Sequence, residues 1–429
     1  MKQRQLLAPV VLLCLLTQTS TANDQQLDTP ATETLPPSTE QRLALAESRL
    51  ASLEQQNSLE DRVRINGFIS FAMERTSNNV KNASGDPLNY RGVDDSWDTR
   101  RLSRAGVQFN ARIDDRTEAV VQLLARGDAA NDYNVDAQWA YIAYDINPDL
   151  TARAGRLVLP FYLHSQYFQA GYAYPWIELP AEVYGRIPKE THEGIDLVWR
   201  TGTGPVSHNV NLFWGSMDVE GINGVYEVRN QTGLNIRSQW QNWTSFIGYT
   251  FSDVSLPLPD QSGAGFYDFS PLSLDEAYAY FATAGIQYDN GRLLVMAETT
   301  QLGINSEENW FPKTPSRYLT VGYRFGQWMP HLTWAQSEAR GKNCPQTLAS
   351  AACVLYSDVG YRQKSWTLGT RYELTPGVAL KAEASRYYDF SNDSINTSGY
   401  FENPALPLLI DPPVNDNPLV FRIAVEAVF

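Results

Sequence analysis

The chain has 429 residues, 43% of them hydrophobic, a mean hydropathy of −0.35 and a formal net charge of −14. So acidic a chain argues against nucleic acid as a partner. With 12% aromatic residues, the composition fits either a β-barrel wall in a membrane, where aromatics band both interfaces, or a soluble β-sandwich or solenoid.

The first 22 residues have the features of a secretory signal peptide. Lys2 and Arg4 form a basic start, and residues 6–16 form an apolar stretch too short to cross a bilayer as a helix. Small residues up to Ala22 provide a cleavage site. Cleavage there would remove two basic residues and no acidic residue, leaving a mature chain with a formal charge of −16.

Residues 23–60 predict a linker and a short helix in the periplasm. Residues 23–39 are polar and contain three prolines, as expected of a flexible linker. Residues 40–60 can be written as a heptad repeat, with apolar core positions, Arg–Glu pairs at the flanking positions and a core asparagine that would fix the register. The residues assigned to this predicted trimerisation helix are Arg42, Leu43, Glu47, Arg49, Leu50, Leu53, Glu54 and Asn57. The alternative is a solvated amphipathic helix of no function, because fewer than three heptads are marginal in isolation.

From Val63 to the end of the chain, the hydrophobic pattern has a period of two, which is typical of β-strands. The last strand is the clearest, since residues 419–429 alternate an apolar face with a face that carries Arg422 and Glu426. Charges on one face are costly in lipid and tolerated in a wet lumen. The strands of a soluble sandwich would also alternate apolar and polar residues. The lengths of the connections between strands are therefore needed to distinguish a sandwich from a barrel.

The connections between these strands alternate strictly between tight turns and long segments. Turn-forming Gly, Asn, Asp and Pro residues mark seven tight turns. The long connections lie near residues 76–98, 127–134, 160–192, 216–226, 252–277, 302–315, 339–362 and 389–417. Fifteen connections predict an all-β fold over residues 62–429: a 16-stranded antiparallel transmembrane barrel with short periplasmic turns and long extracellular loops.

Two cysteines of the mature chain, Cys344 and Cys353, fall in the seventh long connection. Export to an oxidising compartment and their short separation predict a loop disulfide, with two free thiols as the alternative. No metal or other cofactor is expected, because the four histidines are scattered and none is near this pair.

This layout resembles the gram-negative trimeric porins of the 16-strand class. The run from Arg153 to Phe161 is similar to the strand that enters the third long loop of those porins, and the helix before the barrel is similar to that of the DcaP type. Phe429, which closes an alternating strand, resembles the membrane-insertion signal of outer-membrane barrels. The resemblance implies a homotrimer among outer-membrane lipids that passes small hydrophilic solutes and ions, and not an enzyme.

The third long connection carries most of the predicted pore residues. It is rich in aromatic residues, so it would be buried by folding inward onto the wall, as the resemblance implies. The alternative is a loop that packs between subunits or over the rim. The pore-constriction candidates are Arg104, Arg126, Arg153, Arg156, Tyr172, Tyr174, Trp176, Glu178, Glu182 and Arg186. Basic residues slightly outnumber acidic ones on the predicted lumen face, which favours a weak preference for anions.

Other functions need features that this sequence offers only weakly. A barrel-type hydrolase needs a histidine beside a nucleophile, and no Gly-x-Ser-x-Gly run is present. An energy-coupled receptor needs a plug domain, for which residues 23–61 are too few. A hydrolase, or a ligand-binding or adhesion barrel without an open channel, therefore stays as the alternative to a porin.

Overall fold

The computed structural model describes residues 62–429 except 78–79, 83–84, 129–130, 188, 222–223, 259–269, 271–272, 306–312, 340–360, 391–399 and 403–416. The predicted signal peptide, linker and trimerisation helix lie outside the described residues, and so do Cys344 and Cys353. These predictions therefore stay predictions.

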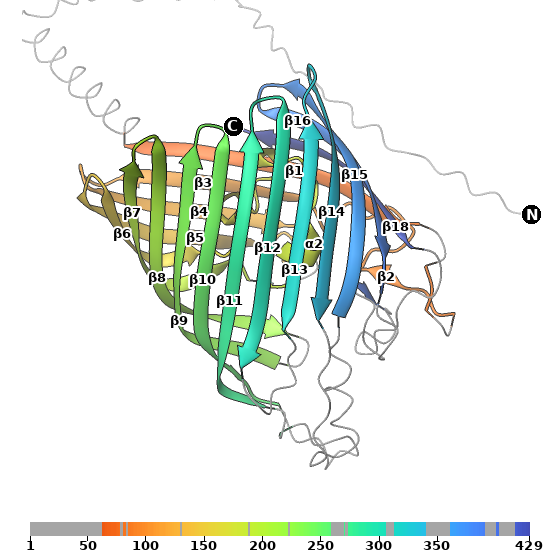
Figure 1. The fold of residues 1–429 in the computed structure, drawn as a ribbon, viewed down its shortest axis with the longest axis horizontal. Helices are drawn as coiled ribbons and strands as arrows, with labels where there is room; N and C mark the ends of the chain where they lie inside the picture. Colours follow the sequence, from red (N-terminus) through yellow and green to blue (C-terminus); the bar gives the residue numbers. More distant parts are fainter. Residues whose placement is uncertain are drawn as a thin grey trace, which may run out of the picture. The chain divides into compact units, whose positions relative to one another are not determined.

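The described strands form one closed antiparallel barrel of 16 strands, as the sequence predicts (Figure 1). Each strand pairs with its neighbours along the chain, and pairing of the first strand with the last closes the ring. The barrel strands are β1 (Val63–Thr76), β3 (Arg104–Arg112), β4 (Thr117–Arg126), β5 (Val135–Asn147), β6 (Leu150–Val158), β7 (Thr191–Thr203), β8 (Val206–Gly221), β9 (Gly224–Trp240), β10 (Trp243–Leu256), β11 (Leu274–Asp289), β12 (Leu293–Asn305), β13 (Thr314–Tyr323), β14 (Trp328–Ala339), β15 (Tyr361–Thr375), β16 (Val378–Tyr388) and β18 (Leu419–Val428). Two short strands, β2 (Asn89–Tyr90) and β17 (Phe401–Glu402), pair as a separate small sheet.

Side chains alternate between the two faces of the wall as expected. On β18, Ile423 and Val425 point outward and are 47% and 41% exposed, whereas Arg422 and Glu426 point inward and are buried. Outward aromatic pairs follow the same rule near the tight turns, where the rings of Trp243 and Tyr288 lie 4.7 Å apart. An apolar outer face with aromatic rings near the turns is what a barrel wall in lipid requires. Among the described residues, no helix has the length and apolar character of a membrane-crossing segment.

The fourth long connection is not a loop, which corrects the sequence prediction. Strands β8 and β9 stay paired until Gly221 lies opposite Gly224, so residues 216–221 and 224–226 belong to the paired strands of a long hairpin. A register shift between Gly215 and Met217 accompanies this extension. Strands that continue beyond the membrane meet water on both faces. Apolar and polar residues need not alternate there, so the sequence pattern resembles that of a loop.

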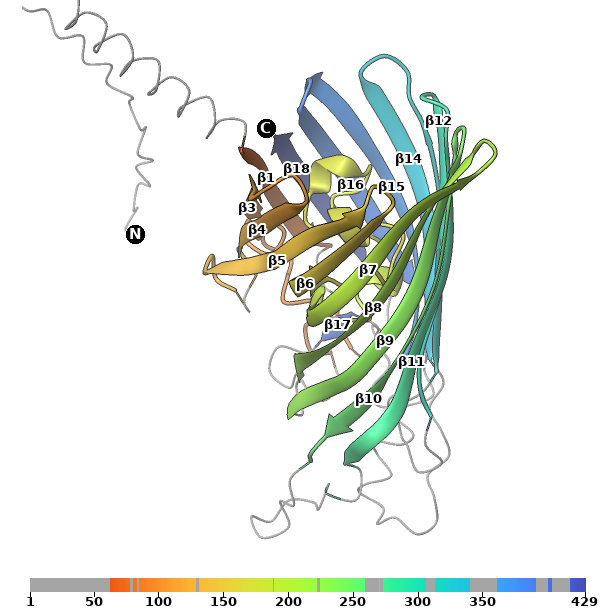
Figure 2. The same cartoon turned by 90° about the vertical axis from the view of Figure 1, so that its left-hand side faces the viewer.

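The third long connection folds into the barrel. Its described residues form three short helical turns, η1 (Ser165–Tyr167), η2 (Gly171–Ala173) and α2 (Ala181–Tyr184). Figure 2 shows this segment, in yellow, inside the ring of strands. Its aromatic residues join the largest buried apolar cluster, in which the ring of Phe161 stacks on that of Phe281 at 5.0 Å. We call residues 159–190 the inner loop.

Candidate functional site

A buried lysine from the wall holds the inner loop. The Nζ of Lys381 on β16 donates to the carbonyl oxygens of Gly171, Tyr174 and Trp176 at 2.8, 2.7 and 2.8 Å. It also pairs with the Glu426 carboxylate at 2.5 Å. Gly171 lies so close that an added Cβ would stand 2.1 Å from that carboxylate, so this contact needs a glycine. We call this group the lysine latch.

A second group of charges joins the inner loop to the first long connection. The carboxylate of Glu178 accepts hydrogen bonds from Arg101 at 2.8 Å, from Arg422 at 2.5 Å and from Arg91 at 3.2 Å. Arg101 and Arg422 also pair with Glu74 on β1. Although burial would raise the pKa of Glu178, the three arginines hold it well below its usual range. Glu178 is therefore ionised at neutral pH.

Replacing Glu178 with Gln is expected to reduce the free energy of unfolding at pH 7 by about 3 kcal/mol, because the arginines lose a buried partner. Since the pKa of Glu178 is lower in the folded state than its unfolded value of about 4.3, this contribution is complete at neutral pH. It disappears only as the pH falls through the folded pKa. Thermal unfolding at pH 7, 5 and 2 measures it.

The matched control for this prediction is Glu227→Gln, which removes an exposed partner of Arg229 and should change stability by less than about 1 kcal/mol. Equal melting temperatures for the two variants at pH 7 would contradict the assignment.

Two further carboxylates at the inner loop, Glu182 of the loop and Glu298 of β12, are buried among hydrogen-bond donors, whereas Glu190 is partly exposed and lines a cavity. Glu298 accepts from the Leu163 N–H at 2.8 Å and the Tyr184 hydroxyl at 2.5 Å. Glu182 accepts from Gln363 at 2.7 Å, and burial raises its pKa. The hydrogen bonds of these two carboxylates therefore help to hold the loop against the wall.

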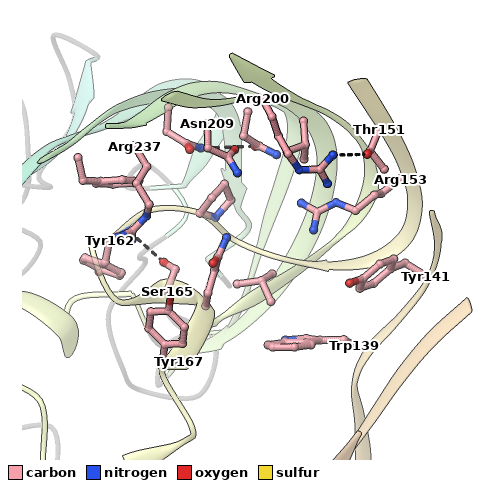
Figure 3. Close-up of a pocket in the computed structure, with 17 residues that line it drawn as sticks. Trp139, Tyr141, Thr151, Arg153, Tyr162, Ser165, Tyr167, Arg200, Asn209 and Arg237 are labelled. Carbon is pink, nitrogen blue, oxygen red and sulfur yellow. Dashed lines mark hydrogen bonds between the residues drawn. The ribbon is translucent and has the colours of Figure 1, made fainter. Parts of the chain in front are cut away.

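A cavity of about 410 Å³ lies between the inner loop and the wall of β5 to β10, on the side of the tight turns (Figure 3). Three arginines line it. Arg153 pairs with Asp196, whereas Arg200 donates to the Thr151 hydroxyl at 3.1 Å. Arg237 donates to the Leu163 carbonyl oxygen. Among the described residues, neither Arg200 nor Arg237 has a carboxylate within 4 Å, so both bring uncompensated positive charge to this cavity.

A second cavity of about 410 Å³ lies on the opposite side of the inner loop, toward the long connections. Arg104 lines it and donates to the Tyr174 hydroxyl at 2.9 Å. Burial raises the pKa of Tyr174 to about 12, so this hydroxyl is neutral at pH 7. Arg126 lies nearby, 3.4 Å from Asp128 and 3.8 Å from Glu190. Arginines thus stand in both cavities flanking the inner loop.

The structure brings most of the pore-constriction candidates together at the inner loop. Arg104, Arg126 and Arg153 point into the lumen, and Arg186 lines a cavity beside the loop. Trp176 is fully buried and donates to Thr333 at 2.8 Å. The remaining loop candidates contact the wall: Tyr172, Tyr174, Glu178 and Glu182.

Arg156 is the exception and corrects the candidate set. It lies on the outer face of β6, three residues after Arg153 in an unbroken strand register, and its Nε is 3.6 Å from Glu193. Alternation therefore excludes it from the lumen. Arg200 and Arg237 were not among the candidates. Strand alternation places them on the lumen face, but the absence of acidic partners is visible only in the structure.

His208 and His164 lack the surroundings that hydrolytic catalysis requires. The Nδ1 of His208 lies 2.8 Å from the Ser238 hydroxyl, and among the described residues no carboxylate comes within 4 Å of that ring. In a catalytic triad, an acid orients Nδ1 and the nucleophile contacts Nε2. Burial lowers the pKa of His164, in the inner loop, to about 3, so that ring is neutral at pH 7.

No protein-family model and no curated protein matches this sequence. Solved structures do. The anion-selective porin from Comamonas acidovorans is 14% identical, with 86% of this chain and 99% of that chain covered and a TM-score of 0.53. The outer membrane channel DcaP of Acinetobacter baumannii is 11% identical over 86% of this chain and 97% of its own, with a TM-score of 0.53. A trimer form of OmpT of Vibrio cholerae is 11% identical over 86% and 99%, with a TM-score of 0.51. The chain has the fold of the 16-strand outer-membrane porins.

Proposed function

We propose that this chain is a passive channel of the outer membrane that admits small hydrophilic solutes and ions and weakly prefers anions. The observation that carries the proposal is the presence of arginines in both cavities that flank the inner loop. Arg104, Arg200 and Arg237 have no carboxylate within 4 Å among the described residues. Of the carboxylates of the inner loop, Glu182 is buried, Glu178 is held by three arginines and Glu190 lies near Arg126. Fixed positive charge in a narrow pore attracts anions.

Two features of the barrel support the membrane location. The outer face is apolar, and the last residue completes the ring, because the N–H and carbonyl of Phe429 pair with those of Gly67. We assign Phe429 the role of membrane-insertion signal. We therefore expect this chain, once exported, to be located in the outer membrane of a gram-negative bacterium.

We also propose a homotrimer. The similar OmpT structure is a trimer form, and the residue 40–60 segment carries the heptad pattern described above. The barrel satisfies its own backbone hydrogen bonds, so each subunit can fold without its neighbours. The predicted helix would then add to contacts made by the walls.

Liposome swelling tests the channel. Liposomes that contain the purified protein should swell in solutions of small sugars, at rates that fall as the sugar becomes larger, because solutes must pass beside the inner loop. Small organic anions should enter faster than cations of similar size. Liposomes that swell no faster than empty ones, in every solute, would contradict the proposal and favour an adhesion barrel or a barrel-type hydrolase.

A further inference from the structure

An apolar cavity of about 270 Å³ opens on the lumen face of the barrel, in the half that carries the long connections. Its wall comes from the inward-facing residues of β8 to β12, among them Met217, Val228 and Val254. The inner loop closes it from the other side through Phe161 and Ile187. The cavity is therefore built by two separate parts of the chain.

This lining differs from the rest of the lumen. Three arginines and three asparagines contribute to the lining of the cavity near the tight turns, whereas Val228 and Val254 lie directly opposite each other on β9 and β10 at the apolar site. If only water filled the lumen at this site, polar residues would be more favourable there, because exposed apolar surface is unfavourable in water. Concave apolar surface with a few polar groups is typical of small-molecule sites.

Polar groups at the edges of the cavity carry opposite charges. Arg186, which lines the cavity, belongs to the inner loop, and Glu220, which also lines it, is exposed near the end of β8. Ile187 lines both this cavity and the one that holds Arg104 and Arg126. An anionic group would therefore be repelled at the outer edge and attracted toward the inner loop.

One buried polar group also faces this space. The side-chain amide of Gln231 is 2% exposed and lines the cavity, and its Oε1 has no hydrogen-bond partner among the described residues. Buried amide oxygens normally have a partner.

We propose that this cavity binds the apolar part of an organic anion, a carboxylate that carries a short alkyl chain or a ring, before the anion moves past the inner loop. The movement of the anion past the inner loop rests on the proposed channel function. Binding itself depends only on the cavity. The carboxylate lies toward Arg186, and the chain or ring packs among the valines.

Block of the ion current by carboxylates of increasing length tests this proposal. Acetate, butanoate, hexanoate and benzoate are added to the side of the long connections while a salt current is recorded from the full-length protein in a planar bilayer. The dissociation constant for block should fall by up to about fourfold for each methylene that enters the cavity. Hexanamide should bind more weakly than hexanoate because it lacks the charge. Equal block by acetate and hexanoate would overturn the proposal.

Two sets of variants locate the site. Val228→Thr with Val254→Thr keeps β-branched residues but places hydroxyls in the cavity, and should weaken hexanoate block at least tenfold while acetate is unaffected. Val120→Thr is the matched control, because Val120 is buried on the lumen face of β4 and outside the cavity. Glu220→Gln should strengthen hexanoate block. Loss of block in the control that equals the loss in the double variant would refute this location.

Equilibrium dialysis separates this proposal from the channel function. Hexanoate should bind to the protein in lipid nanodiscs more than to empty nanodiscs, and the double threonine variant should lose that excess. This result would support the binding site even if the protein carried no current. No excess binding of hexanoate to the unmodified protein would overturn the proposal whatever the conductance.

Discussion

Replacing Lys381 with Met should release the inner loop from the wall and raise the ion conductance of the proposed channel. The substitution removes the donor shared by three loop carbonyls and leaves the buried carboxylate of Glu426 without its partner. Breaking a buried ion pair on one side costs about 3–5 kcal/mol. The free energy of unfolding should fall by that amount, and a loop that no longer fills the lumen should leave a wider path.

Unfolding in urea and single-channel conductance measure the two parts of this prediction. Adding Glu426→Gln to Lys381→Met should recover part of the stability, because it removes the unpaired charge. It should not restore the conductance, because the loop carbonyls still lack their donor. Arg324→Gln is the control, since its pair with Asp289 is partly exposed and should contribute less than about 1 kcal/mol. A Lys381→Met variant with unchanged conductance and stability would refute the lysine latch.

Replacing Arg104, Arg200 and Arg237 together with Gln should remove the preference for anions. These arginines carry the positive charge of the lumen that no nearby carboxylate offsets among the described residues. A unit charge 4 Å from a passing ion is worth about 1 kcal/mol even in bulk water, or about fivefold in the permeability ratio. The reversal potential in a salt gradient should move to zero or change sign.

The charge-neutral pair Arg153→Gln with Asp196→Asn is the matched control for selectivity. It changes two lumen residues that pair with each other and leaves the net charge of the pore unchanged, so the reversal potential should stay as it is. Replacing the three arginines with Lys should also keep the preference, because the charge remains. An unchanged reversal potential in the Gln variant would contradict the assignment of selectivity to these residues.

The arginines that we expect to set the preference for anions differ in part from the pore-constriction candidates that the sequence predicts, and the structure gives the reason. The sequence places Arg104, Arg126 and Arg153 alike among the pore-constriction candidates and does not distinguish between them. In the structure, Arg126 and Arg153 have acidic neighbours, so their charge is largely offset. Partners on different strands have no fixed spacing along the chain, and the sequence alone therefore could not separate paired from unpaired arginines.

The parts of the fold that the membrane enforces could be predicted. Lipid on one face and water on the other impose alternation on each strand, which is why the strand number and the inward direction of Arg422 were predicted correctly. Beyond the membrane this constraint ends, and residues 216–226 were mistaken for a loop. The lysine latch could not be predicted, because it joins Lys381 to backbone groups about two hundred residues away.

The central claim is that the barrel is an open, arginine-lined channel, and the reversal potential of the unmodified protein tests it most directly. In a planar bilayer with a gradient of potassium chloride, the protein should give stable stepwise currents. The sign of the reversal potential should show that chloride is more permeant than potassium. A current that falls in three equal steps at high voltage would indicate a trimer in which each subunit forms a separate pore. A barrel that inserts without conducting, or one that clearly prefers potassium, would contradict the account.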